Sequence, residues 1–396
     1  MKKTGKLLTI VTIATIVTIA TTGTIRAQGF SLDWHGFVNP HYYADSRAVV
    51  GGRDYMMLFY PDTIRRDAQG NDLNDGWQAN MLGITARLGL TVKGPDVWGA
   101  KAMGYIEGDF TGSTNESIND LRLRHAYIKL DWEHHHLLAG QYWYGMVIHE
   151  IMPMTNPLNM GSPFHCYARY NQVRYEYHLH GFEAVGVAQW QLDNKSQGLL
   201  NGSSKPGSST QFARHSLLPE LNAQLRYRGE IVFLGIAANF KTIQPIVPDS
   251  QHRLHSSFTW SLFEKVALGP VTVKAQTLLN NSLYEGCSLG GYLMLVDSTF
   301  QDWHFNTVWL DVERTKGHWR PGIFFGYAKN LDYGNTNYTQ CFGRGHNIGY
   351  LWRVQPRLTY TTLTGFSFTT EAEYTRAGYD IPVGNLRLSL SMVYSF

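Results

Sequence analysis

Three short motifs in the chain contain residue types that could carry out chemistry or bind a metal. The stretch "GCSLG" (286–290) matches the Gly-x-Ser-x-Gly pattern of serine hydrolases, in which a sharp turn exposes a nucleophilic serine. The stretch "EHHH" (133–136) offers three imidazoles, a side chain that commonly binds metal ions. The stretch "DAQGNDLND", from Asp67 to Asp75, offers carboxylate and amide oxygens, which suit calcium.

None of these motifs meets the requirements of its chemistry. A catalytic Ser288 needs a strand, a turn and a helix in an α/β sheet, and the sequence predicts no such sheet. Three adjacent imidazoles on a short turn point in different directions, so they do not converge on one ion. The acidic stretch lacks the calcium-loop spacing of an EF-hand, although the sequence leaves open whether Asp67 to Asp75 hold a cation. We expect no catalytic residue, metal centre or cofactor, and hence no enzyme.

A larger set of charged residues occupies alternate positions of apolar segments. In "LNAQLRYR", for example, Arg226 and Arg228 alternate with Leu225 and Tyr227. Period-2 alternation indicates a strand with one polar and one apolar face. If such strands cross a membrane, a basic side chain turned toward lipid at mid-membrane costs about 2 to 4 kcal/mol. These charges should then face a polar interior. The residues that we expect to line a pore are Arg87, Lys101, Arg174, Arg226, Arg228, Arg353, Arg357, Glu371 and Glu373.

The segments that carry these charges predict an all-β protein of about sixteen strands. Long helical periodicity is missing, aromatic residues are abundant (23 Tyr, 19 Phe, 11 Trp), and only 16% of residues are charged, as is typical of a membrane β-barrel. The predicted joins alternate between short ones and long ones. We therefore predict a transmembrane antiparallel up-and-down β-barrel with long external loops and short periplasmic turns.

Two segments do not fit this pattern simply. In "LRLRHAYIKLDW" the apolar face contains Arg122 and Arg124, so either these arginines lie beyond the hydrocarbon or a β-bulge re-aims the strand. The stretch "GGYLMLVDSTF" (290–300) could form an additional strand, but the alternation of long and short joins places it in a loop.

The N-terminal segment has the order of a secretory signal peptide. Lys2, Lys3 and Lys6 precede a long apolar run, and Ala27 closes the segment. We expect removal of residues 1–27, which leaves residues 28–396 as the barrel; a retained membrane anchor is the alternative. Removal takes four basic residues with it and changes the net charge from +3 to −1, so no nucleic-acid partner follows from the composition.

The last strand ends the chain on Phe396. A closed barrel pairs its final strand with its first, so a strongly alternating strand can stand at the terminus without fraying. A terminal Phe after such a strand also resembles the signal by which barrel proteins are handed to the outer-membrane assembly machinery.

The third long join, about residues 144–171, follows the fifth predicted strand. Its length favours a functional or self-packed loop. We expect it to fold inward and to narrow the pore, and the alternative is a surface loop packed on the barrel mouth. The candidate constriction residues are His149, Glu150, His165 and Arg169.

The cysteines are too few for a disulfide framework. The chain has three, Cys166, Cys287 and Cys341, so at least one stays unpaired in a monomer. Cys287 and Cys341 could pair if their loops meet, and the sequence leaves this open.

Three stretches carry a resemblance to a known family: "NMLGITARLGLTVKGPDVWGAKAMGYIEGDF", "LRLRHAYIKLDW" and "LLAGQYW". The chain resembles the porin-type outer-membrane proteins of Bacteroidetes and is similar to DcaP-like trimeric porins. The resemblance implies a sixteen-stranded homotrimer in a Gram-negative outer membrane, with an inward loop, that passes small and preferentially anionic solutes. One departure is the lack of a heptad-bearing extension before the first strand.

The sequence therefore favours a passive outer-membrane channel whose partners are small solutes, ions and the surrounding lipid. Two alternatives stay open. One is an outer-membrane hydrolase, either a protease or a phospholipase; the other is a plugged barrel whose loops bind partners at the cell surface.

Overall fold

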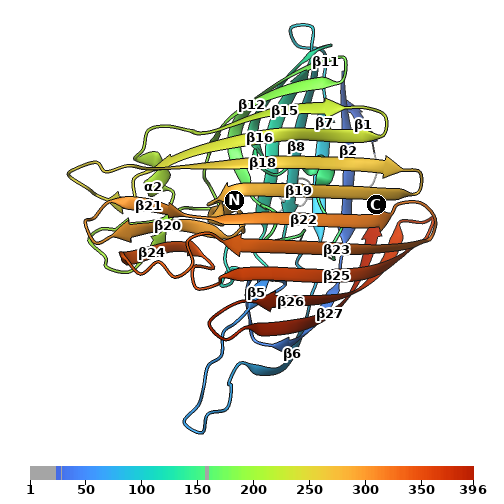
Figure 1. Ribbon diagram of the computed structural model, residues 1–396. Helices are drawn as coiled ribbons and strands as arrows, with labels where there is room; N and C mark the ends of the chain where they lie inside the picture. The colour runs from blue at the N-terminus through green and yellow to red at the C-terminus, as the bar shows by residue number, and fades with distance from the viewer. Residues whose placement is uncertain (1–23, 28, 157–159) are drawn as a thin grey trace, which may run out of the picture.

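The computed structural model describes residues 24–27, 29–156 and 160–396. The chain forms a closed, antiparallel, all-β barrel of sixteen strands, as the alternation predicted (Figure 1). Within the described residues, no helix is both long enough and apolar enough to cross a membrane.

Each strand of the wall pairs with its neighbours in chain order. The first two wall strands are each interrupted, and each is therefore built from two labelled segments. In order around the barrel, the wall consists of β2 (Phe30–Val38) with β3 (His41–Arg47), β6 (Asp75–Leu82) with β7 (Arg87–Lys93), β8 (Lys101–Asp109), β9 (Arg122–Asp131), β10 (His135–Trp143), β11 (Arg169–Leu179), β12 (Phe182–Trp190), β15 (Glu220–Arg228), β16 (Val232–Ile243), β18 (His255–Leu268), β19 (Val271–Asn281), β22 (Phe305–Arg314), β23 (Trp319–Asn330), β25 (Tyr350–Thr361), β26 (Phe366–Ala377) and β27 (Val383–Ser395).

The final strand closes the barrel against the first. β27 pairs with β2 at residues 37–38 and with β3 at residues 41–45. Beyond β27, the Phe396 N–H donates to the Gly36 carbonyl (3.1 Å), and the Gly36 N–H donates to the Phe396 carbonyl (2.9 Å). A side chain at Gly36 would collide with the Arg87 carbonyl, because a Cβ there would lie 2.3 Å from that oxygen. The last residue is therefore part of the closed ladder.

Side chains alternate between the two faces of the wall. In β27, Arg387 and Ser391 are buried in the interior, whereas Leu388 and Leu390 are 45% and 48% exposed on the outer surface. The same alternation continues around the wall: most outward side chains are apolar and most inward ones are polar or charged, with apolar exceptions such as Trp309 and Phe324.

A β-bulge explains why Arg122 and Arg124 interrupt the apolar face of β9, and it is one of the two alternatives that the sequence left open. The register between β8 and β9 shifts at Glu107 and Gly108. This β-bulge turns both Arg122 and Arg124 toward the interior.

Long loops leave one end of the barrel and short turns leave the other, as expected. Short joins such as residues 180–181 and 269–270 lie at the end that holds the C-terminus (Figure 1). At the opposite end, the loops fold into small elements, some of which extend beyond the end of the wall and some of which turn into the barrel interior. These comprise the hairpin β4 (Val49–Gly52) and β5 (Met57–Pro61); a sheet of β13 (Gln197–Leu200), β14 (Gly207–Ser208) and β17 (Ile246–Val247); a sheet of β20 (Gly290–Leu295), β21 (Phe300–Trp303) and β24 (Tyr338–Arg344); and the short helices η1 (His149–Ile151), α2 (Gln211–Arg214) and η2 (Tyr284–Gly286). Residues 290–300 are thus outside the barrel wall, as predicted.

Most of the predicted signal segment lies outside the described residues. Within it, β1 (Thr24–Ala27) pairs with β2 in antiparallel register.

We predict that deleting Phe396 lowers the yield of closed barrel, because both hydrogen bonds to Gly36 are lost, each contributing about 0.5–1.5 kcal/mol. The measurement is the fraction that migrates as the compact form in unheated detergent gels. Phe396→Tyr, which keeps the backbone and the ring, is the control and should fold normally. An unchanged yield for the deletion would show that closure does not depend on this residue.

Candidate functional site

Three loop segments fill much of the barrel interior. They are the hairpin β4–β5 (49–61), the crossing loop (144–168) and the segment 282–289. Their central residues are buried, and Leu58, Ile151 and Leu289 are each 0% exposed. The interior of this barrel is therefore packed rather than uniformly open.

The crossing loop reaches from one wall to the wall opposite. Near its start, Gln224 of β15 donates to the Gly145 carbonyl (2.6 Å). Further on, the Lys274 ammonium of β19 donates to the Met152 carbonyl (3.1 Å), and the Asn156 N–H donates to Glu371 of β26 (3.0 Å). These contacts hold the loop across the interior.

Arginines of β25 and β27, in the part of the wall that we call the far wall (β19 to β27), hold the loops against the barrel. Arg353 of β25 donates to the carbonyls of Ser162 (2.6 Å) and Phe59 (3.1 Å), and thereby joins the crossing loop to the hairpin. Arg387 of β27 donates to the carbonyls of Met56 and Tyr55. A guanidinium has five N–H groups in a fixed fork, so one side chain can satisfy several loop carbonyls at once.

The segment 282–289 is fastened by a buried ion pair. Lys241 of β16 lies 2.8 Å from the Glu285 carboxylate, and both side chains are nearly inaccessible. Ser288 donates to the Pro163 carbonyl (3.0 Å) and accepts from Asn281 (2.7 Å), which links this segment to the crossing loop.

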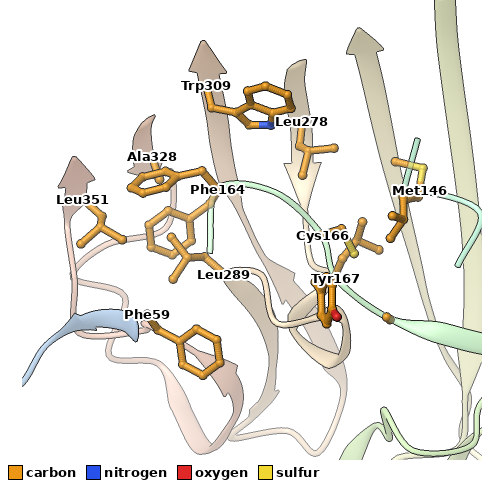
Figure 2. Close-up of a cluster of buried hydrophobic side chains, with 14 of the residues drawn as sticks. Phe59, Met146, Phe164, Cys166, Tyr167, Leu278, Leu289, Trp309, Ala328 and Leu351 are labelled. Atoms are coloured by element: carbon orange, nitrogen blue, oxygen red, sulfur yellow. The ribbon is translucent and has the colours of Figure 1, made fainter. Parts of the chain in front are cut away.

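An apolar cluster packs the loops against the wall. Figure 2 shows Phe164 of the crossing loop and Leu289 among wall side chains that include Ala328 and Leu351, with Phe59 of the hairpin below them. Phe164 is fully buried, and burial of a Phe side chain contributes about 1.5–3 kcal/mol.

A set of arginines surrounds the Tyr167 hydroxyl at the end of the crossing loop. Arg169 donates to it (2.8 Å), as does Arg124 (3.4 Å). The Arg169 guanidinium also lies 4.0 Å from the centre of the Trp143 ring, in cation–π geometry. We call this set the arginine–tyrosine cluster; its members are Arg87, Arg122, Arg124, Arg169 and Tyr167.

Two carboxylates neutralise only part of this cluster. Glu107 lies 2.5 Å from Arg124, and Asp109 lies 2.8 Å from both Arg122 and Arg124. Arg169 forms no ion pair with any carboxylate in the part of the chain that the structure describes. Four guanidinium groups thus face two carboxylates, and the cluster keeps two positive charges in excess.

The surroundings change the acidity of two loop side chains in the interior. Burial alone would raise the pKa of Tyr167, but the guanidinium groups of Arg169 and Arg124 outweigh it and lower that pKa to about 7. Burial lowers the pKa of His165 to about 4, so this imidazole stays neutral near pH 7. His165 is hydrogen-bonded to Gln276 (2.7 Å) and anchors the loop.

Open space remains beside β8 to β11 and β15, which we call the near wall. A cavity of about 310 Å³ lies against β8 to β11 and β15, and the crossing loop borders it through Val147, His149 and Glu150. A smaller cavity of about 60 Å³ is bordered by Arg53, Thr111 and members of the arginine–tyrosine cluster.

The structure divides the predicted pore residues into several environments. Arg174 and Arg226 border the larger cavity, and Arg87 belongs to the arginine–tyrosine cluster. Lys101 is exposed at the short-turn end, where it pairs with Asp96 (2.8 Å). Four others are buried: Arg353 pairs with Glu373 (3.0 Å), Arg357 pairs with Asp311 (2.7 Å), and Glu371 accepts the Asn156 N–H (3.0 Å). Arg228 is half-exposed and pairs with Glu183 (2.6 Å) and Glu150 (2.9 Å).

The four predicted constriction residues are also separated. His149 and Glu150 border the larger cavity, Arg169 lies in the cluster, and His165 is buried away from the open space. The sequence did not single out Arg53 or Tyr167 for this site, and it named Arg122 only as an irregularity. The possible bulge in "LRLRHAYIKLDW" was the one available signal.

The side chains of the chemical motifs have hydrogen-bond partners within the protein. Ser288 is buried between Asn281 and Pro163, as described above. His135 bonds to Tyr175 and His136 to Asp131, so neighbouring imidazoles point to different partners. No group of metal-ligating side chains suited to a metal ion occurs in the described residues.

Two other arrangements bear on the alternatives left open by the sequence. Ser257 and Asp302 both bond to the same nitrogen of His255 (3.3 and 2.6 Å), whereas a catalytic triad needs the acid on the other imidazole nitrogen. In the acidic loop, Asp67 accepts the N–H groups of Gln69 and Asn71, as in an ordinary polar turn.

All three cysteines are unpaired in this structure. Cys166 lies in the crossing loop, and burial raises the pKa of its thiol well above the usual range.

Comparisons with known proteins show what this barrel resembles. No protein-family profile matches the sequence, and no curated protein is detectably similar to it. Among solved structures, the outer-membrane channel DcaP of Acinetobacter baumannii has a TM-score of 0.68 at 18% identity, and the alignment covers 95% of this chain and 100% of that one. An anion-selective porin from Comamonas acidovorans has a TM-score of 0.57 at 9% identity (93% and 100% covered), and OmpF of Salmonella typhi, in complex with daunomycin, 0.56 at 11% (94% and 100%).

These similarities establish the class of fold, a sixteen-stranded porin-like barrel. At such low identities they establish the fold alone. They give no support to the Bacteroidetes part of the expected resemblance.

We predict that Arg353→Met releases the hairpin and the crossing loop, because three loop carbonyls lose their donor and Glu373 loses its ion pair. Breaking one partner of a buried pair typically costs about 3–5 kcal/mol. Limited trypsin digestion should then cut the hairpin at Arg53, and thermal unfolding should begin at a lower temperature. Arg376→Met, on the outward face of β26, is the matched control. Identical digestion of both variants would show that Arg353 does not hold the hairpin and the crossing loop in place.

Proposed function

We propose that this protein is a porin, a passive channel for small hydrophilic solutes in the outer membrane of a Gram-negative bacterium. The observation that carries the proposal is the uneven filling of the barrel. Loops cover the interior of β19 to β27, while cavities remain along β8 to β11 and β15. A solute would therefore pass along the near wall.

In this proposal the crossing loop constricts the passage. It borders the 310 Å³ cavity with His149 and Glu150, and it carries Tyr167 at the edge of the smaller cavity. Its contacts with β19, β22, β25 and β26 would keep the constriction at a fixed width, which sets the size limit for solutes.

The proposed charge preference is for anions. The arginine–tyrosine cluster has two excess positive charges at the smaller cavity, and rings of Arg and Lys suit anion pores. Near the larger cavity, by contrast, Arg174 pairs with Glu176 (2.5 Å), and Glu150 pairs with Arg228 (2.9 Å), so less net charge acts there. The anion-selective porin among the similar structures makes this preference reasonable.

The remaining parts of the proposal follow from the sequence and the fold class. Residues 1–27 serve as a signal peptide, Phe396 is read by the outer-membrane assembly machinery, and the barrel assembles as a homotrimer. A trimer form of OmpT from Vibrio cholerae occurs among the similar structures. Lipid contacts the outward apolar face.

The alternatives have less support. A hydrolase would need a nucleophile and a base in productive geometry, and the Ser257, His255 and Asp302 arrangement lacks it. A plugged, purely surface-binding barrel agrees with the packed far wall, but it leaves the cavities beside the cluster unexplained. Single-channel conductance distinguishes a porin from a plugged surface-binding barrel, since a plugged barrel should conduct little.

We predict that deleting residues 152–161 increases single-channel conductance, because this part of the crossing loop spans the interior. The measurement is made in planar bilayers on protein first shown to be closed by its gel migration. A matched deletion of the exposed residues 201–205, which lie in a different loop, should leave conductance unchanged. Equal conductance for both deletions would place the constriction elsewhere.

We predict that Arg169→Gln reduces anion preference, because Arg169 contributes charge that no described carboxylate neutralises. The reversal potential under a KCl gradient should move toward zero relative to the native channel. Arg376→Gln, on the outward face, is the control and should leave the potential unchanged. A native channel that prefers potassium would falsify the proposed anion preference without affecting the barrel assignment.

We predict that anion preference declines as pH rises through about 7. Above its pKa of about 7, Tyr167 becomes a phenolate, and its negative charge offsets one excess positive charge of the cluster. Below that pH the phenol is neutral and the full excess remains. Reversal potentials measured across this range should show the decline, and Tyr167→Phe, which has no ionisable group, should remove it. A decline of equal size in the variant would assign the effect to other groups.

A further inference from the structure

A second site candidate lies among the loops, separate from the interior passage. A cleft of about 750 Å³ opens between four loops at the long-loop end, and no residue that lines it also lines the two interior cavities. The four loops are residues 62–74, 331–337, 345–349 and 378–382. Clefts of this size at the mouth of a β-barrel are common ligand sites.

Aromatic side chains form the walls of this cleft, and neighbouring groups hold them in place. The Tyr333 hydroxyl donates to Asp380 (2.7 Å), and the Tyr379 hydroxyl donates to the Pro61 carbonyl (2.9 Å). Tyr338 packs edge-on against His346, with the ring centres 4.9 Å apart. Because these rings are already fixed, a ligand that stacks on them would lose less conformational entropy on binding.

Hydrogen-bond donors and acceptors surround the aromatic walls. Asn347 and Thr336 are exposed, and their side chains make no hydrogen bond with the part of the chain that the structure describes. Asp380 uses one carboxylate oxygen for Tyr333, and no described residue donates to its other oxygen. An amide, a hydroxyl and a carboxylate oxygen together offer donors and acceptors at several angles.

The cleft has no net charge, in contrast to the arginine–tyrosine cluster. Arg66 and Asp380 are the formal charges among its lining residues, and they compensate each other. Burial lowers the pKa of His346, so that imidazole is neutral near pH 7. An anion of the kind proposed for the passage therefore has no electrostatic reason to collect here.

We propose that this cleft binds a neutral saccharide. A sugar ring presents an apolar C–H face that can stack on Tyr333, which is 42% exposed, and it carries hydroxyl groups around its rim that can bond to Asn347, Thr336 and Asp380. The inference does not depend on conduction through the barrel. The saccharide can be a free oligosaccharide or the carbohydrate part of a surface glycolipid, because both present the same chemistry.

The test is isothermal titration of the full-length protein in detergent. One arm uses maltotriose, cellotriose, tri-N-acetylchitotriose and mannotriose, and a second arm uses a neutral O-polysaccharide released from bacterial lipopolysaccharide. We expect saturable binding in at least one arm. Binding confined to the first arm indicates a free saccharide, and binding confined to the second indicates a glycolipid. Absence of saturable binding in both arms would overturn the proposal.

Four variants locate the binding. Tyr333→Ala should weaken it about fivefold to tenfold, whereas Tyr333→Phe, which keeps the ring, should weaken it less. Asn347→Ala should also weaken binding, and Asn337→Ala, an exposed asparagine outside the cleft, should not. Gel migration checks that each barrel is closed, and single-channel conductance should stay at the native value. Equal affinity of all variants would place the saccharide elsewhere and overturn the assignment.

Discussion

The closed backbone ladder is the constraint on which the rest of this structure depends. In a wall that excludes water, every N–H and carbonyl needs a partner within the sheet, and closure is the arrangement that leaves no edge. Here closure is achieved between β27 and the interrupted first strand. The interruption falls at Pro40, which has no N–H to contribute, and β27 pairs with both halves around it. Once this register is fixed, the face of every wall residue is fixed with it.

The inward face created by closure is polar, but much of it serves packing instead of solvation. Arg353 and Arg387 give their N–H groups to loop carbonyls, and Arg357 is neutralised by Asp311. Arginine suits this role because its guanidinium is planar, stays charged and carries several donors in a rigid fork. Loop backbone brought into the barrel would otherwise hold unsatisfied carbonyls, so inward arginines and inward loops require each other.

Local pattern was enough to predict the wall, and it could not predict the interior. Alternation in the last strand correctly assigned Arg387 inward and Leu388 outward, because one face of a strand meets lipid whatever lies inside. The same alternation could not tell that Arg353 is covered and Arg174 borders a cavity, since that difference depends on which loop lies over each. The roles of Arg122 and Arg124 depended on a register shift of β9 against β8, which single-strand periodicity cannot reveal.

The charge that a solute would meet in the proposed passage is therefore not the sum of the charges on the inner wall. An inward arginine that is paired and covered, such as Arg357, contributes stability and little field to the open space. Arg169 differs because aromatic rings hold it: its guanidinium lies over Trp143 and Tyr167, and aromatic faces position a cation without neutralising it. The position of the crossing loop thus determines both features of the proposed passage. It covers the far wall, and through Tyr167 it helps to hold an uncompensated guanidinium at the narrow cavity.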